Sequence, residues 1–313
     1  MEPFLPSRRT LNLGILSLLL PISGVAHGCA SAYPGRKGGA ALASIENRFG
    51  GKLGATILNA KSGKSISHRG DERFGMCSSF KLALAAIILH KVDRGELALD
   101  NFVPIVQADM VYFAPVVTKN LSNGGMTVGA LAEAAQVFSD NVATNKLLDL
   151  IGGPEGFTSQ LRALGDTVTR LDRKEPEMML VPSGDRRDTT SPDAMARTCA
   201  KLLATDFLSE TSRATLFGWM EATTTGSKRI RAGLPPAWRS GDKTGTGLAP
   251  NMPDRYNDIA ITWPAAGPTA GIPFIITAFY ESPVKSDEMR LVDEAVLAEV
   301  GRLAAEWAVA GVL

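Results

Sequence analysis

A serine and a lysine at helical spacing form the first candidate catalytic pair of this chain. Ser78 and Lys81 lie three residues apart in Cys77-Ser78-Ser79-Phe80-Lys81, so a helix would place both side chains on one face. A lysine in that position can activate the serine hydroxyl as a nucleophile without histidine. The pair alone is weak evidence, because serine and lysine occur at this spacing by chance in many chains.

Three further polar groups follow along the chain. Ser139-Asp140-Asn141 supplies a hydroxyl and an amide, Glu175 a carboxylate, and Lys243-Thr244-Gly245-Thr246 a cation beside hydroxyls. Each has an ordinary explanation when taken alone: a loop or cap tripeptide, a solvated charged loop and a common strand end. Together and in this order they indicate acyl transfer to a serine.

Histidine and metal chemistry are disfavoured by the same sequence. Outside the N-terminal leader the only histidines are His68, at the end of an early strand, and His90, three turns along the serine helix. Neither is placed for a Ser-His-Asp triad, and no cysteine or histidine cluster suggests zinc. We therefore expect no metal and no cofactor, and lysine and glutamate must carry the protons.

Length and charge restrict the class of protein. The 313 residues are 45% hydrophobic and 21% charged, which suits one large globular domain or two closely packed ones. The formal net charge of +1 gives no general reason to expect nucleic acid or an anionic membrane as partner. We expect a small-molecule substrate and a monomer.

The N-terminus has the pattern of an export signal, predicted to span residues 1–32. Ser7-Arg8-Arg9-Thr10-Leu11 precedes an apolar run over residues 11–20, and Ala30-Ser31-Ala32 fits cleavage between small residues. The arginine pair favours the twin-arginine route, with the Sec route and lipoprotein processing at Cys29 as alternatives. The run is shorter than the ~20 residues of a spanning helix. We therefore expect cleavage near Ala32, no membrane anchor and a periplasmic location.

Two cysteines, Cys77 and Cys199, remain after the signal is removed. Export permits a disulfide, but their spacing does not establish one. Cys77 adjoins the candidate nucleophile at a helix start, and Cys199 falls in a later helical segment. We predict two buried free thiols, with a disulfide as the alternative.

Hydrophobic periodicity predicts strands near both ends of the chain and helices between them. Residues 53–60 and 64–68 alternate around a Lys61-Ser62-Gly63 turn as a hairpin does, and the strand pattern returns late in the chain. The late strands are predicted at 258–263 and 274–280, and helices at 82–92, 128–138, 143–151, 193–204 and 287–308. This order favours one sheet built from both termini, with a helical insertion.

The segment that carries the serine is apolar nearly all round. Residues 78–94 therefore predict a buried helix, which Gly95 would end. The start of a buried helix leaves backbone N–H groups unpaired and carries partial positive charge. Ser78 is thus expected in surroundings that suit a developing oxyanion.

The combination of Ser78-x-x-Lys81, Ser139-Asp140-Asn141, Glu175 and Lys243-Thr244-Gly245 resembles the class A serine β-lactamases, over essentially the whole mature chain. The resemblance implies an α/β (α+β) fold of the β-lactamase and penicillin-binding transpeptidase type. It has a five-stranded antiparallel sheet with terminal helices, formed here by residues 33–75 and 223–313, and an all-helical part at 76–222. The site would lie in the groove between the two parts of this single domain.

The resemblance also implies roles in acylation. Ser78 would attack the β-lactam carbonyl, and Lys81, Glu175 acting through water, or both would take its proton. The backbone N–H groups of Ser78 and Thr246 would hold the oxyanion, and Ser139 would protonate the departing nitrogen.

Substrate binding is implied for a second set of residues. Asn141 would hold the substrate amide and Lys81. Lys243 and Thr244, on a strand ended by Gly245, would hold the substrate carboxylate by charge and hydrogen bond. The implied binding residues are Asn141, Lys243, Thr244, Gly245, Thr246, Phe113 and Arg229. Phe113 is expected as an apolar surface at the mouth, although a lone aromatic is more often ordinary packing.

The loop residue Glu175 would allow the acyl-enzyme to be hydrolysed, because in the family this glutamate activates the deacylating water. Without it the enzyme would remain acylated. By the same resemblance, Arg173 and Asp188 would clamp the loop as an ion pair and Asn145 would support it from beneath. The Glu175-Pro176 bond would be cis. One departure is Met179, which stands where the family usually has an asparagine that shares the water. A thioether is a poor hydrogen-bond partner, so slower turnover of some substrates is expected.

Features of class A carbapenemases are present in part. Cys77, Thr246 and Arg229 match them, but Gly247 replaces the cysteine that pairs with Cys77 in many of those enzymes. Residues 248–255 are also longer than usual. The sequence predicts hydrolysis of penicillins and cephalosporins, which confers antibiotic resistance, and leaves carbapenems open. The alternatives are a D-Ala-D-Ala peptidase or penicillin-binding protein and a non-hydrolytic β-lactam sensor.

Overall fold

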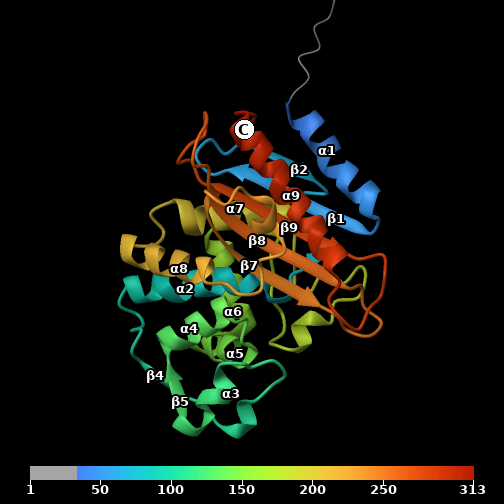
Figure 1. The fold of residues 1–313 in the computed structure, drawn as a ribbon. Helices are drawn as coiled ribbons and strands as arrows, with labels where there is room; N and C mark the ends of the chain where they lie inside the picture. The colour runs from blue at the N-terminus through green and yellow to red at the C-terminus, as the bar shows by residue number, and fades with distance from the viewer. Residues whose placement is uncertain (1–33) are drawn as a thin grey trace, which may run out of the picture. The chain divides into compact units, whose positions relative to one another are not determined.

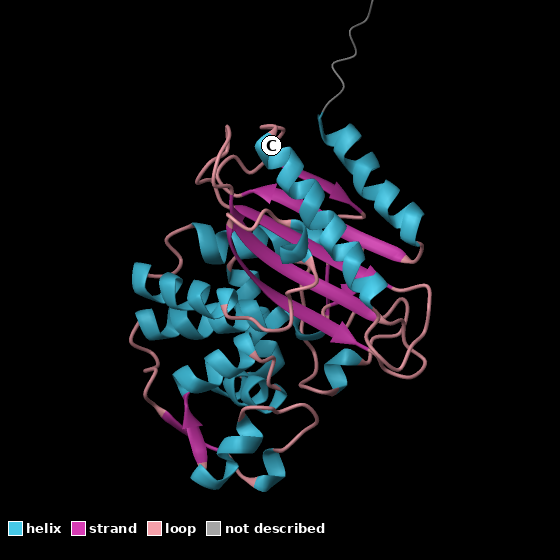
Figure 2. Cartoon of the chain, in the orientation of Figure 1, coloured by secondary structure: helices cyan, strands magenta, loops and turns pink. Residues whose placement is uncertain are grey.

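A five-stranded antiparallel sheet in the order β2-β1-β9-β8-β7 organises the computed structural model (Figure 1). The structure describes residues 34–313, so the predicted signal peptide lies outside the described residues. Both ends of the described chain supply the sheet, as predicted (Figure 2). Its strands are β1 (Lys52–Asn59), β2 (Ser65–His68), β7 (Arg239–Gly247), β8 (Arg255–Trp263) and β9 (Phe274–Glu281).

Strand pairing joins the start of the described chain to its end. β1 pairs with β9 from Lys52↔Glu281 to Asn59↔Phe274, and β7 pairs with β8 from Arg239↔Trp263 to Gly247↔Arg255. β7 is therefore an edge strand, and its backbone groups on the open side are not used by the sheet.

Helices cover both faces of the sheet. α1 (Pro34–Phe49) and α9 (Leu291–Val309) pack on one face, and α7 (Pro192–Ala204) and α8 (Glu210–Glu221) on the other. Two hydrophobic clusters result: one lies between the sheet and the terminal helices, and the other joins the opposite face to the helical region. Within residues 34–313, none of the helices combines the length and hydrophobicity needed to cross a bilayer.

The helical region is built around α2 (Lys81–Asp93), whose residues from Lys81 to Leu89 are all buried. Burial of the whole circumference of its first turns agrees with the sequence prediction. Helices α4 (Val128–Val137) and α5 (Asn141–Leu150) pack against α2, α6 (Gly153–Ala163) packs on α5, and α3 (Val117–Asn120) lies beside the short strand at Gly125–Thr127. Short strand pairs connect the region: β3 (Phe74–Gly75) with β6 (Thr189–Thr190), and β4 (Phe102–Pro104) with β5 (Gly125–Thr127). The 3-10 turns are η1 (Cys77–Phe80), η2 (Gln107–Asp109), η3 (Leu121–Asn123), η4 (Glu177–Met179) and η5 (Ile230–Gly233).

Several predicted element boundaries were wrong: β8, for example, begins at Arg255 instead of residue 258. Ser78 lies in η1, one turn before α2 begins, rather than in the α-helix itself. The strand that carries Lys243 continues past Gly245 to Gly247, because β8 pairs with it to Arg255. The last helix begins at Leu291 instead of residue 287, because the preceding residues are held by hydrogen bonds to Asp254 and Tyr256.

Candidate active site

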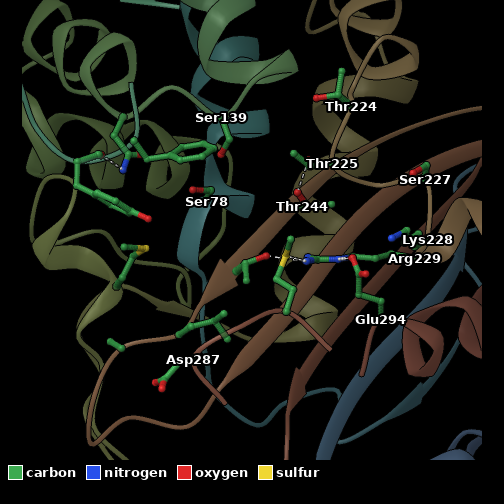
Figure 3. A pocket seen from close by; sticks show the side chains of 18 residues that line it. Ser78, Ser139, Thr224, Thr225, Ser227, Lys228, Arg229, Thr244, Asp287 and Glu294 are labelled. Carbon is green, nitrogen blue, oxygen red and sulfur yellow. Dashed lines mark hydrogen bonds and ion pairs between the residues drawn. The ribbon is translucent and has the colours of Figure 1, made fainter. Parts of the chain in front are cut away.

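Ser78 is presented by the tight turn η1 at the buried start of α2. Its Oγ donates to Glu175 Oε1 at 3.3 Å. The preceding residue, Cys77, has φ +44°, a left-handed conformation that is rare for a side chain of this type. Figure 3 shows Ser78 and Ser139 close together at the same end of the pocket. The turn therefore directs the hydroxyl at the pocket and at a carboxylate.

Lys81 is completely buried and is held by three oxygen-bearing groups. Its Nζ donates to Asn141 Oδ1 at 2.5 Å and to the Ser139 carbonyl at 2.9 Å, and lies 3.0 Å from Glu175 Oε1. Burial lowers the pKa of Lys81, while the nearby Glu175 carboxylate raises it and opposes the shift. Glu175 Oε1 thus contacts both the serine hydroxyl and the lysine.

Asp140 fixes the orientation of its two neighbours in the chain. Its carboxylate caps α5 by accepting from the Ala143 N–H, and it also accepts from the N–H groups of Val116 and Val117. Ser139 has φ +59°, so the backbone turns sharply just before the helix. These contacts place the Ser139 and Asn141 side chains toward Lys81.

The loop that carries Glu175 is held from both sides, with the contacts that the family resemblance implied. Asn145 Nδ2 donates to the Glu175 carbonyl at 2.8 Å, and its Oδ1 accepts from the Glu175 N–H at 3.0 Å. Arg173 Nε lies 2.6 Å from Asp188 Oδ2, and the Glu175–Pro176 bond is cis. Among residues 34–313, Glu175 Oε2 is buried without a hydrogen-bond partner.

β7 forms the opposite side of the site. Lys243 Nζ donates to Ser139 Oγ at 3.1 Å and to the Thr244 carbonyl at 2.8 Å. Burial, with a further contribution from the positive charge of Lys81, lowers the pKa of Lys243 to about 7. The strand approaches η1 so closely that a Cβ on Gly245 would lie 2.6 Å from the Met76 carbonyl oxygen. Gly245 is needed here for that close approach.

Arg229 lies behind β7 and is only 1% exposed. Its Nη1 donates to the carbonyls of Gly245 and Asn257, and its Nη2 donates to Thr246 Oγ1 at 2.6 Å. Glu294 Oε1 lies 3.3 Å from its Nε. Arg229 therefore lies at the edge of the pocket, where it holds the Thr246 hydroxyl in place.

Two carboxyl groups, Asp242 and Asp258, lie buried beneath the Lys243 strand. Burial, together with the neighbouring Asp258, raises the pKa of Asp242 well above its usual range, and burial also raises the pKa of Asp258. Arg231 Nε lies 2.6 Å from Asp242 Oδ1. Burial and the charge of Asp258 thus oppose ionisation of Asp242, while Arg231 favours it.

A cavity of about 570 Å³ connects these groups, within the usual range for ligand pockets. Several predicted residues line it: Ser78, Phe113, Ser139, Asn141, Met179, Arg229, Thr244 and Thr246. Lys81, Glu175, Lys243 and Gly245 are not on its surface and lie buried behind those residues. The structure also brings in residues that the sequence did not single out: Tyr112, Thr224, Thr225, Ser227, Lys228, Asp287, Met289 and Glu294. Leu248 and Ala249, from the segment 248–255 noted for its length, line the cavity as well. Thr224 and Thr225 carry a signal as part of a threonine run after a helix; the Thr225 hydroxyl lies 2.6 Å from that of Thr244 (Figure 3).

The cysteines and histidines of the described chain lie outside this network. Cys77 and Cys199 are buried free thiols, as predicted, and burial raises the pKa of Cys77 to about 11. His68 lies against Glu46, and His90 Nδ1 lies 2.8 Å from the Phe207 carbonyl. Both imidazoles are engaged in structural contacts.

Comparison with known proteins agrees with this arrangement. The sequence pattern of the beta-lactamase enzyme family matches residues 39–308. Beta-lactamase L2 of Stenotrophomonas maltophilia is 43% identical over 263 residues, which is 84% of this chain and 83% of the relative. Beta-lactamase FAR-1 of Nocardia farcinica is 41% identical over 84% of this chain and 80% of its own length.

Solved structures give the same result. An ancestral (GNCA) class A beta-lactamase superposes with a TM-score of 0.79 at 46% identity, covering 86% of this chain and 99% of that structure. A beta-lactamase from Xanthomonas campestris gives a TM-score of 0.79 at 41% identity, with 87% and 98% covered. The shared fold, the extent of the matches and the serine, lysine and glutamate around one pocket agree, and the chain therefore belongs to the beta-lactamase enzyme family, as a class A serine β-lactamase.

Proposed function

We propose that this enzyme hydrolyses penicillins and cephalosporins through an acyl-enzyme on Ser78, and so confers resistance to them. The observation that carries the mechanism is the position of Glu175 Oε1, within hydrogen-bonding distance of both Ser78 Oγ and Lys81 Nζ. A buried carboxylate beside the nucleophile can take its proton and can later activate water. No metal or cofactor enters these steps.

In the acylation step, Ser78 Oγ attacks the lactam carbonyl carbon and its proton passes to Glu175. A charged Lys81 supports this transfer, whereas a neutral Lys81, which burial favours by lowering its pKa, can itself take the Ser78 proton. This second route allows acylation when Glu175 is replaced. The backbone N–H groups of Ser78 and Thr246 stabilise the oxyanion. The C–N bond then breaks, and Ser139, between Lys81 and Lys243, gives its proton to the leaving nitrogen. Ser139 regains a proton from Glu175 through Lys81, so that Glu175 is again a carboxylate when the acyl-enzyme has formed.

In the deacylation step, a water molecule attacks the ester and Glu175 accepts its proton. Glu175 Oε2 suits this role, because it accepts no hydrogen bond from any other group within residues 34–313. The C–O bond to Ser78 breaks and the hydroxyl is restored. The Arg173–Asp188 ion pair and Asn145 keep the glutamate in place as positioning residues.

Binding is assigned to the β7 side of the pocket. Lys243, Thr244 and Thr246, supported by Gly245 and Arg229, receive the substrate carboxylate by charge and hydrogen bonds. Asn141 receives the substrate amide, and Phe113 provides an apolar surface at the mouth, where it is 47% exposed. Carbapenem hydrolysis is a narrower proposal, which rests on Cys77, Thr246 and Arg229.

We further propose export to the periplasm by a signal at residues 1–32, followed by action of residues 33–313 as a single monomeric domain. The Arg8-Arg9 pair and the small residues before Tyr33 support the signal. Detection of the processed N-terminus in a periplasmic extract would test it, and an uncleaved protein would contradict it.

The mechanism is tested by time-resolved mass spectrometry with benzylpenicillin. The wild type is expected to consume substrate with no lasting adduct, whereas Glu175→Gln accumulates a covalent adduct on Ser78. A Ser78→Ala variant serves as the control that forms none. A long-lived adduct on the wild type would instead indicate a penicillin-binding protein or sensor.

A further inference from the structure

One end of the pocket is formed by two loops that contain none of the catalytic groups. The turn between β7 and β8, residues 248–254, contributes Leu248 and Ala249, and the segment 282–290 before α9 contributes Asp287 and Met289. Figure 3 shows Asp287 at this end, away from Ser139. We call these two loops together the distal wall.

Lys285 joins the two loops. Its Nζ donates to the Ala249 carbonyl at 2.8 Å and forms an ion pair with Asp254, both in the other loop. Asp254 is buried, and its second carboxylate oxygen accepts from the Ser286 N–H at 2.6 Å. The Asp254 carbonyl also accepts from the Ser282 N–H at 2.8 Å. Asp254 and Lys285 therefore act as a clamp between the loops.

The same segment is held again just before α9. The Arg290 N–H donates to Tyr256 Oη at 3.0 Å, and Met289 Sδ lies 3.9 Å from Arg229 Nη2. Residues 287–289 thus form a short bridge between two attachment points, Asp254 at one end and Tyr256 at the other. Two of these three residues line the pocket, so their position depends on both attachments.

We propose that Lys285 is a specificity-determining positioning residue, which holds the distal wall in place and limits the size of the β-lactam side chain that the pocket accepts. This inference rests on the proposed β-lactam hydrolysis. Lys285 itself touches no catalytic group, and its side chain is 44% exposed. Its removal should leave the chemistry intact while allowing residues 287–289 to move.

The test compares a compact and a bulky substrate in Lys285→Met. For ceftazidime, whose oxyimino side chain is large and branched, we expect KM to fall about tenfold, because less of the binding energy is used to displace the wall. Benzylpenicillin kcat and KM should stay within about twofold of the wild type, since a compact side chain does not need the wall to move. Lys285→Arg can keep the contacts with Asp254 and the Ala249 carbonyl, and should restore the wild-type ratio of the two KM values.

A matched control and a double-mutant cycle complete the design. Lys61→Met removes an exposed lysine from the β1–β2 turn and should leave kcat and KM unchanged for both substrates. Asp254→Asn alone, and together with Lys285→Met, should change the ceftazidime KM no more than the single lysine variant does. If Asp254→Asn does not fold, the Lys285 variants decide the question alone.

The outcomes separate the inference from the function on which it rests. If Lys285→Met changes KM equally for ceftazidime and benzylpenicillin, the clamp does not determine specificity. The same conclusion follows if Lys285→Arg does not restore the wild-type KM for ceftazidime. A wild type that hydrolyses neither compound would overturn the proposed function, and the inference with it.

Discussion

The two sides of the pocket are held in place by different means. On the helical side, Ser78, Lys81, Ser139 and Glu175 are positioned by hydrogen bonds between their own side chains and nearby loops. On the sheet side, β7 is positioned by the regular backbone ladder with β8. Backbone pairing tolerates side-chain changes, whereas a network of buried polar groups depends on every member. The helical side should therefore control kcat and the sheet side mainly KM.

Replacing the two buried lysines tests this division most directly. Lys81→Met leaves Glu175 buried without its cation, so we expect kcat to fall by about 10³–10⁴. Lys243→Met removes a binding charge and should raise KM more than it lowers kcat. Steady-state and stopped-flow kinetics with benzylpenicillin would show the split, and equal effects on kcat in both variants would remove the distinction.

Gly245→Ala should break the contact between the two sides. Its Cβ would lie 2.6 Å from the Met76 carbonyl and 2.9 Å from the Ser79 nitrogen, so β7 or the nucleophile turn must shift. Displacement of this kind can lower kcat/KM by about 10²-fold. Gly218→Ala, at an open helical position in α8, is the matched control and should leave activity unchanged. Wild-type activity in Gly245→Ala would show that the two sides are not rigidly joined.

The pH dependence of binding sharpens the comparison further. Because the pKa of Lys243 is lowered to about 7, its ammonium is charged below that pH and neutral above it. We expect kcat/KM for a carboxylate-bearing substrate to fall by up to about fiftyfold between pH 7 and pH 9, as the charged fraction of Lys243 falls. Lys243→Arg stays charged and should flatten that decline. A decline of equal size in the arginine variant would assign the titration to another group.

The smallest expected effect concerns Met179, which lines the pocket from η4 near the Glu175 loop. Met179→Asn supplies an amide that can share the deacylating water, worth about 1 kcal/mol, or about fivefold in the deacylation rate. Burst kinetics with a slowly hydrolysed cephalosporin would measure it. Leu180→Asn, at the exposed neighbouring position, is the control. Equal deacylation rates for Met179→Asn and the wild type would exclude the effect.

Some features could be predicted from the sequence because they depend on local spacing. The Ser78–Lys81 pair needs only helical periodicity, and the hairpin at β1 and β2 needs only alternation around a short turn. The loop contacts of Arg173, Asp188 and Asn145 followed from the family resemblance, and the structure contains them.

Other features arise only when distant strands are paired. The burial of Arg229 behind Gly245 and Thr246, and the Asp242–Asp258 pair, depend on the register of β7 against β8. The Asp254–Lys285 clamp likewise joins loops that are adjacent only after β8 and β9 pair. Local periodicity contains no information on these contacts, and the predicted start of the last helix was wrong for the same reason.

The pairing of β1 with β9 has a consequence for the order of events during synthesis. The first hairpin leaves the ribosome early, but its sheet neighbour is formed by Phe274–Glu281, close to the C-terminus. Closing so long a loop is entropically unfavourable until the late strands exist. The β1 edge of the nascent hairpin therefore stays unpaired until β9 has been synthesised. A chain that ends before β9 should not fold into an active enzyme.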